Sequence, residues 1–272
     1  MSKFSYTTMA SPDWDGRTAI KKAREYGFQG VDLRISDHLG ELKVTSTDAE
    51  IGELKTVFRE EGITASSLLA YNEQANADPA SWSKLKESVL KNLEIGTKLG
   101  TRLVRIFIGN PDSAHDHDAF IRRSADVLAE VLQTDASPTS LIIQNHTGGV
   151  GIHDILEIMN TVRSPRLHMV LCPANASCMQ ERFDDVLPKI KDSLPQLYIA
   201  DLKHGAQFKD GHGTALPGQG DIDFGAIYAG LGAGQFGGWI SFKWEKIWSP
   251  ELPGPEIALP HFIQYIKRLT QG

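Results

Sequence analysis

The feature that most constrains the fold of this chain is a strand-like segment followed by a helix-like segment, and this pair occurs eight times. Each strand-like segment is a short apolar or β-branched run, and each helix-like segment carries apolar residues at helical spacing. The predicted strands cover residues 4–9, 30–35, 63–70, 102–108, 140–144, 167–171, 197–202 and 238–242. The predicted helices cover residues 18–26, 47–61, 81–99, 118–132, 152–162, 179–194, 224–231 and 257–269.

Strands that alternate with helices form parallel sheets through right-handed crossovers. Eight units of roughly 32 residues account for most of the chain, which is the organisation of a closed (β/α)8 barrel. The rival fold, a doubly wound open sheet, typically has fewer strands and a glycine-rich first turn. Here the first turn reads Ala10-Ser-Pro-Asp-Trp. We therefore predict an α/β protein with a single (β/α)8 domain over residues 1–272.

Single residues mark several helix ends. Thr47 and Glu50 have the spacing of a capping box at the start of the second helix. Gly27 and Gly62 are typical of the residue that ends a helix, because glycine adopts the left-handed conformation at low cost. Pro188 predicts a kink within the sixth helix.

The charge balance and the hydrophobic pattern exclude several classes of partner. The chain has 28 Lys and Arg against 34 Asp and Glu, a formal charge of −6, whereas a nucleic-acid-binding surface is basic. No apolar run is long enough for a transmembrane helix, and the N-terminus lacks the apolar core of a secretory signal. Cys172 and Cys178 are too few for a disulfide framework. We expect a cytoplasmic protein whose partner is a small molecule, with no nucleic acid and no membrane.

In a (β/α)8 barrel the chemistry takes place where the strands end and the strand–helix loops begin. The polar residues at these predicted positions are Arg34, Arg105, Gln144, His146, Cys172, Asn175, Asp201, Lys203, His204, Lys243 and Glu245, with Trp14 from the first loop as a stacking platform. Each of them alone could be structural; Arg34, for example, could pair with Asp32 or Asp37. The occurrence of so many polar residues at equivalent strand ends favours a pocket for a polar ligand.

The sequence segments around these positions are distinctive enough to compare with known families. The segments are Gln144-Asn-His-Thr-Gly-Gly, Leu171-Cys-Pro-Ala-Asn-Ala, Asp201-Leu-Lys-His, Leu216-Pro-Gly-Gln-Gly-Asp-Ile-Asp-Phe and Trp239-Ile-Ser-Phe-Lys-Trp-Glu-Lys-Ile-Trp-Ser-Pro-Glu-Leu-Pro. Together they resemble the xylose isomerase-like TIM-barrel family of sugar phosphate isomerases and epimerases. The resemblance is clearest over residues 140–266. It implies a TIM barrel that acts on a small carbohydrate-like substrate.

In that family four strand-end side chains, a Glu, an Asp, a His and a Glu on the fifth to eighth strands, hold a divalent metal. The resemblance places Gln144, Cys172, Asp201 and Lys243 at these positions. A Lys ammonium repels a divalent ion, and a hard ion such as Mg²⁺ or Mn²⁺ needs several oxygen ligands. The resemblance therefore implies a divergent member without a metal or another cofactor, its pocket balanced by an Asp201–Lys243 ion pair.

The implied chemistry is the movement of a proton beside a sugar carbonyl. Lys243 would supply the positive charge of the missing metal at the developing enolate. The general base would be Asp201, Glu245 or Lys203, provided that its surroundings bring its pKa near neutrality.

The remaining candidates would bind the substrate. The planar guanidinium groups of Arg34 and Arg105 suit a carboxylate or a phosphate. His146 and His204 would exchange protons with the sugar or hydrogen-bond to it. Cys172 is either a nucleophile or, as is usual for a cysteine with no activating His nearby in the sequence, a small apolar filler.

Other functions stay open at this point. A slip in the register of the seventh strand would turn His204 inward, and with His146 and Glu245 it would build a different metal site for a metal-dependent isomerase. Alternatively, the chain is a catalytically inactive barrel that binds a sugar or metabolite. The acidic stretch 113–118 is interpreted as a helix cap, since Asp favours a helix N-terminus. Because barrels of this family often dimerise, the resemblance also suggests a homodimer.

Overall fold

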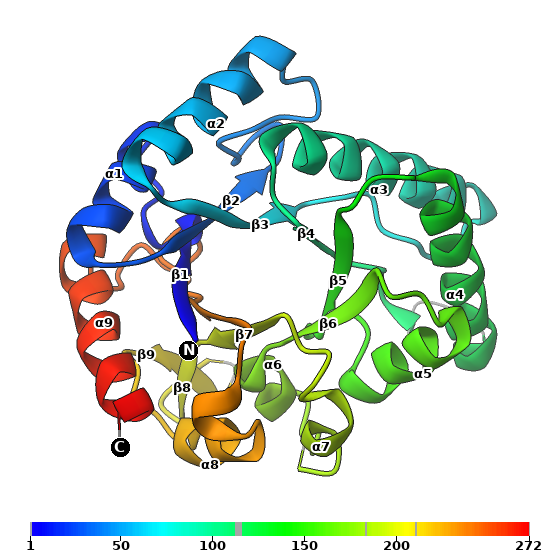
Figure 1. The fold of residues 1–272 in the computed structure, drawn as a ribbon. Coiled ribbons are helices and arrows are strands. Elements are labelled where there is room, and N and C mark those ends of the chain that lie inside the picture. Colours follow the sequence, from blue (N-terminus) through cyan, green and yellow to red (C-terminus); the bar gives the residue numbers. More distant parts are fainter. Residues whose placement is uncertain (1, 112–115, 183, 210, 272) are drawn as a thin grey trace. The chain divides into compact units, whose positions relative to one another are not determined.

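The computed structural model describes residues 2–111, 116–182, 184–209 and 211–271. Within these ranges, parallel strands form a closed barrel in the order β1-β10-β7-β6-β5-β4-β3-β2 (Figure 1). The barrel strands are β1 (Lys3–Thr7), β2 (Gly30–Ile35), β3 (Thr64–Ala70), β4 (Leu103–Ile106), β5 (Ser140–Gln144), β6 (Leu167–Leu171), β7 (Gln196–Ile199) and β10 (Trp239–Phe242). The predicted (β/α)8 fold class is confirmed.

Helices follow the barrel strands along the chain. They are α1 (Gly16–Tyr26), α2 (Asp48–Glu61), α3 (Pro79–Leu99), α4 (His117–Thr134), α5 (Ile152–Val162), α6 (Pro173–Cys178), α7 (Leu187–Ile190), α8 (Phe224–Gly230) and α9 (Pro255–Gln271), with 3₁₀ turns η1 (Thr8–Ala10) and η3 (Ala233–Gln235). In the part of the chain that the structure describes, no helix is long and apolar enough to cross a membrane.

Two predicted elements differ from the structure. The predicted helix 179–194 is wrong: the helix α6 begins earlier, directly after β6, with Pro173 in its first turn. The backbone of Gln180 has a φ of 56°, in the left-handed region that no helix continues through. Pro188 then lies in the first turn of the short α7, where a missing N–H costs nothing, and so it helps to start a helix instead of bending one.

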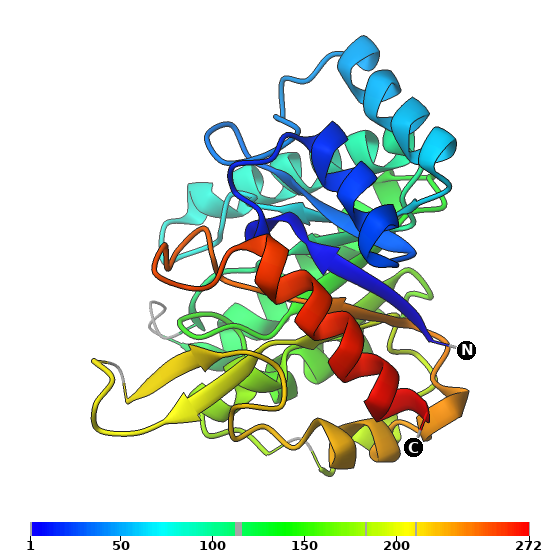
Figure 2. The same cartoon turned by 90° about the vertical axis from the view of Figure 1, so that its left-hand side faces the viewer.

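The second difference concerns the predicted strand 197–202. The barrel strand β7 ends at Ile199, and β8 (Asp201–His204) pairs antiparallel with β9 (His212–Ala215) in a separate two-stranded sheet. In Figure 2 this hairpin, drawn in yellow, projects outward as a two-stranded arm. Asp201 therefore starts the hairpin and does not end a barrel strand.

The chain packs as two compact units. The first contains Met1–Asp32, Val57–Thr64 and Leu171–Gly272, and the second contains Leu33–Thr56 and Ala65–Val170. In the first unit, β10 pairs with β1 on one side and β7 on the other, and α1 packs against α9. In the second, β4 pairs with β5, and α4 packs against both α3 and α5 (Figure 1).

Side-chain alternation decides which residues of the second unit face the barrel interior. Val104 points at α3, since a Cβ added to Gly96 of that helix would lie 2.7 Å from a Val104 methyl group. Neighbours along a strand point to opposite faces, so Arg105 points to the interior. Arg105 is in register with Ile142. Gln144, two residues further along β5, therefore faces the interior as well.

The helix starts follow from local signals in the sequence. Thr47 and Glu50 form the predicted capping box, with hydrogen bonds in both directions between the backbone of one and the side chain of the other. Gly27 ends α1 with a φ of 89°. In the acidic stretch 113–118, residues 113–115 lie outside the described residues, and Asp116 accepts a hydrogen bond from the Ala119 N–H at the start of α4. The capping interpretation is confirmed for Asp116.

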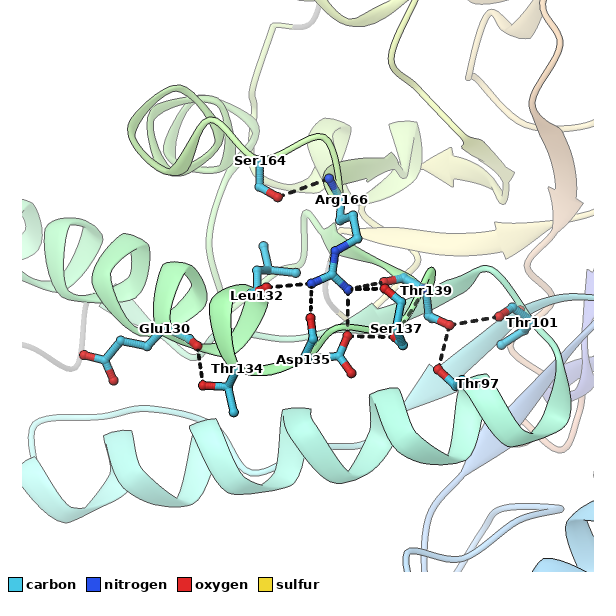
Figure 3. A network of polar contacts seen from close by, with 10 residues as sticks. All are labelled: Thr97, Thr101, Glu130, Leu132, Thr134, Asp135, Ser137, Thr139, Ser164 and Arg166. Atoms are coloured by element: carbon cyan, nitrogen blue, oxygen red, sulfur yellow. Dashed lines mark hydrogen bonds and ion pairs between the residues drawn. The ribbon is translucent and has the colours of Figure 1, made fainter.

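A single arginine holds the connection between α4 and β5. The Arg166 guanidinium donates to the carbonyls of Leu132, Asp135, Ser137 and Thr139 and to the Asp135 carboxylate, at 2.5–3.1 Å (Figure 3). These carbonyls belong to the last turn of α4 and the loop that follows it, where no helical N–H is available. Arg166 thus replaces a C-cap and fixes where β5 begins.

Candidate functional site

Lys243 and Glu245 form an ion pair directly after β10. The Lys243 N–H donates to the Ile199 carbonyl at 2.9 Å, so the backbone at Lys243 still belongs to the strand ladder. The Lys243 side chain is 8% exposed, and its Nζ contacts a carboxylate oxygen of Glu245, whose side chain is 26% exposed. The site therefore holds a buried ammonium beside a carboxylate that solvent still reaches.

The loop after β10 fixes this pair. The Trp244 ring is buried, stacks on Phe242 and donates from Nε1 to the Pro253 carbonyl at 3.0 Å. The Lys246 ammonium donates to the carbonyls of Pro250 and Leu252. Trp244 is thus a core residue, not a platform for a sugar. Alternate residues of this segment therefore have different roles. Lys243 and Glu245 form the ion pair, whereas Trp244 and Lys246 hold the loop.

Cys172 follows β6 and is fully buried. Burial raises the pKa of its thiol, and the nearby Lys243 ammonium opposes this effect only in part. The thiol is therefore protonated at neutral pH, which favours the filler role over the nucleophile role considered from the sequence. Asn175 lies three residues on, half-buried in α6.

The Asp201 carboxylate is a hub for backbone N–H groups. Its Oδ1 accepts from Leu202 at 3.0 Å and Ile222 at 3.3 Å, and its Oδ2 accepts from Gly218 and Gly220, both at 2.9 Å. A Cβ at Gly220 would lie 2.2 Å from Oδ1, so only glycine fits there. The Leu216-Pro-Gly-Gln-Gly-Asp text thus encodes a loop that wraps this carboxylate, and the ion pair expected between Asp201 and Lys243 is replaced by one between Lys243 and Glu245.

The β8–β9 hairpin carries two further candidates, and both are exposed. Lys203 lies on the surface, so it lacks the buried environment that a lysine base requires. The Nε2 atom of His204 lies 3.0 Å from Ser177 Oγ. Nearby, Nε2 of His212 lies 3.4 Å from the Cys178 sulfur. These contacts tie the hairpin to α6.

In the second unit Arg105 is buried and stacked. The centre of its guanidinium lies 4.0 Å from the ring centroid of Phe107 and 5.2 Å from that of Tyr71. One terminal nitrogen donates to the Ala70 carbonyl at 3.0 Å, and Nε has no partner. The structural ion pair that a buried arginine usually forms is not found for Arg105 among the described residues.

Arg34 has a carboxylate partner, and it is neither Asp32 nor Asp37. Its Nε and Nη2 donate to Glu41 Oε1 at 3.1 and 2.5 Å, and its backbone N–H donates to Oε2 at 2.7 Å. Both side chains are almost fully buried. The remaining terminal nitrogen, Nη1, is buried without a partner.

Three more candidates have defined places. Gln144 ends β5, and its buried Nε2 has no hydrogen-bond partner among the residues that the structure describes. His146 is half-buried, and its Nδ1 lies 2.7 Å from the Thr147 carbonyl. A carbonyl can only accept, so Nδ1 of His146 carries a proton. Trp14 is half-buried in the loop between η1 and α1.

The first unit also contains a buried polar group that was not predicted from the sequence. The Asp32 carboxylate accepts hydrogen bonds from Gln196 Nε2 at 2.8 Å and from the Ser241 hydroxyl. All three side chains are inaccessible to solvent. The sequence does place one polar residue in each of three apolar strands. That these three residues bond to one another could not be predicted, because they are far apart in the chain.

The four residues that the sequence resemblance assigns to the family's ligand positions have side chains that do not fit a divalent metal ion. Lys243 is a cation already paired with Glu245, the Asp201 oxygens are occupied by backbone N–H groups, Cys172 is a protonated thiol, and Gln144 offers a neutral amide. Among the residues that the structure describes, no three His, Cys, Asp or Glu side chains gather as a metal site, which includes the set expected from a slipped seventh strand.

Residues 20–265 match the family described as xylose isomerase-like TIM barrel. None of the curated proteins matches the sequence. Among solved structures, L-ribulose 3-epimerase is 16% identical with a TM-score of 0.77, over 100% of this chain and 95% of that one. The IOLI protein with a zinc atom bound is 17% identical with a TM-score of 0.76, over 98% and 96%. The 3-keto-D-glucoside 4-epimerase from E. coli is 14% identical with a TM-score of 0.75, over 98% and 100%. At these identities the likeness shows the fold alone.

Proposed function

Because the chain belongs to the xylose isomerase-like TIM barrel family, we propose that it is a sugar isomerase or epimerase that works without a divalent metal. Two of the structural relatives described above are named as sugar epimerases, which supports the substrate class. The observation that carries the proposal is the buried Lys243 ammonium beside Glu245. The sequence resemblance assigns a metal ligand of the family to the Lys243 position.

The reaction requires two groups. A base removes the proton from the carbon next to the substrate carbonyl, and a positive charge stabilises the enolate oxygen that forms. The Lys243 ammonium supplies that charge and donates a hydrogen bond to the oxygen, in a buried position where such an interaction is strong. Return of a proton from solvent to the other face of the same carbon gives an epimer. Return of a proton to the former carbonyl carbon, with transfer of the neighbouring hydroxyl proton to the enolate oxygen, gives an isomer.

Glu245 is the base that the first unit supports best. Its carboxylate is adjacent to Lys243 and remains partly open, so a substrate oxygen can replace it as the partner of the ammonium. The carboxylate is then released to accept a proton. Asp201 and Lys203 are weaker candidates, because the Asp201 oxygens hold backbone N–H groups and Lys203 is exposed.

The test is solvent-proton exchange under chelation. Protein desalted in the presence of EDTA is incubated in D₂O with a panel of ketoses, including L-ribulose, and deuterium next to the carbonyl is followed by NMR. We expect the wild-type protein to exchange this hydrogen. Lys243→Met and Glu245→Gln should each lower the rate by roughly a hundredfold or more. Lys267→Met removes an exposed ammonium from α9 and should leave the rate unchanged.

Three outcomes contradict the proposal. Exchange that appears only after Mn²⁺ or Zn²⁺ is added would establish a metal-dependent enzyme. Binding of a sugar by calorimetry without any exchange would establish an inactive, ligand-binding barrel. Full activity of the Lys243→Met variant would remove the ammonium from the mechanism.

A further inference from the structure

We propose that Arg105 anchors a carboxylate-binding site in the second unit, which favours a sugar acid over the corresponding neutral sugar. The sugar part of this inference rests on the proposed function, whereas the carboxylate part stands on the second unit alone. The observation is a buried guanidinium that, among the described residues, has a vacant donor and no carboxylate partner.

Arg105 differs from the other arginines of the second unit that have low exposure. Arg34 pairs with Glu41, and Arg166 pairs with Asp135. No carboxylate lies within ion-pair distance of Arg105 in the described ranges, although its residue exposure is only 2%. A buried charge without a counter-ion lowers the stability of a protein, as does the removal of one partner from a buried ion pair. A negatively charged ligand bound to Arg105 would restore that stability.

The contacts of Arg105 leave one edge of its guanidinium without a partner among the described residues. Aromatic rings of Tyr71 and Phe107 lie against the guanidinium, and the Ala70 carbonyl takes one terminal nitrogen. The vacant Nε–H lies on the edge that it shares with Nη2. This edge of a guanidinium has the spacing of the two oxygens of a carboxylate and binds it through two parallel hydrogen bonds. The stacking holds the plane fixed before the ligand arrives.

Other buried donors of the second unit are vacant too. Gln144 faces the barrel interior from β5, the strand next to β4, and its Nε2 has no partner. Arg34 Nη1 also has none. Glu41 neutralises Arg34, so Arg105 alone contributes a net positive charge. One uncompensated charge fits a carboxylate monoanion better than a phosphate dianion, and the vacant amide suits a sugar hydroxyl.

The test measures binding alone, so it does not depend on turnover. Three matched sets are titrated by calorimetry: D-glucuronate, D-glucose and D-glucose 6-phosphate; the same three forms of D-galactose; and the same three of D-mannose. We expect one uronate to bind at least roughly tenfold more tightly than its neutral sugar. Arg105→Met should abolish this preference. Arg102→Met removes an exposed charge from the residue just before β4 and should preserve it.

Thermal melting gives a second readout that does not need a fully matched sugar. The uronates should raise the melting temperature of the wild-type protein more than the neutral sugars do, and this difference should vanish in Arg105→Met. The proposal is wrong if no uronate stabilises the wild-type protein above its neutral counterpart. It is also wrong if the phosphate esters are preferred, or if Arg105→Met retains the preference. A failed exchange experiment with normal uronate binding would overturn the catalytic proposal only.

Discussion

Replacing Asp201 by Asn tests whether this buried carboxylate is a structural hub or a catalytic base. Each carboxylate oxygen accepts two backbone N–H groups, Leu202 and Ile222 on Oδ1 and Gly218 and Gly220 on Oδ2. An amide keeps one oxygen and turns NH₂ towards the other two donors. Two hydrogen bonds to a charged acceptor are lost, at about 1.5–3 kcal/mol each, and one of the four is weaker because it is 3.3 Å long. We expect a loss of about 3–5 kcal/mol.

Urea denaturation measures this loss as a change in the free energy of unfolding. Hydrogen exchange by mass spectrometry locates it, because protection should fall first in the peptide that contains Gly218 and Gly220. Asp192→Asn serves as the control, since Asp192 is exposed and should change the stability by less than about 0.5 kcal/mol. The reasoning would be refuted if the Asp201→Asn variant kept wild-type stability and wild-type amide protection in the loop but no longer exchanged the substrate hydrogen with D₂O. That result is the signature of a catalytic base.

Three further predictions concern stability and the thiols. Arg166→Ala should destabilise the protein by about 2–3 kcal/mol in urea, because several carbonyls and a carboxylate lose their donor. Since burial raises the pKa of Cys172 above 9.0, the unfolded chain releases this proton first, and stability should fall as pH rises above 9.0; Cys172→Ala should remove that part of the slope. Burial also raises the pKa of Cys178, so its alkylation by iodoacetamide at pH 8 should be slower than that of a free cysteine by mass spectrometry, and Cys172 should react only after denaturation.

Much of the fold was predictable because its signals are local. Apolar spacing identified the strand and helix segments, and the alternation of segments alone favoured a closed barrel. Thr47, Glu50 and Gly27 act on backbone groups within four residues, so their roles could be read from spacing. Arg105, Lys243 and Glu245 were site candidates because they are polar residues at the ends of predicted barrel strands.

The partners of these residues were not predictable in the same way. Arg34 had three carboxylates within seven residues, and the one that binds it was selected by the conformation of the loop that brings Glu41 back to the strand. Asp201 resembled a free carboxylate at a strand end, because nothing in its own segment indicates that residues 218–222 return to it. Such choices depend on loop geometry, which hydrophobic periodicity does not encode.

The buried hydrogen bonds of Asp32 have a consequence for the order in which the barrel is built. Its acceptor oxygen serves Gln196, 164 residues away, and Ser241, 209 residues away. β1 likewise pairs with a strand far away in the sequence, β10, with Lys3 opposite Trp239. Contacts of such high sequence separation form slowly. One edge of β1 therefore stays open during synthesis until β10 has been made, and an open strand edge can pair with a neighbouring chain.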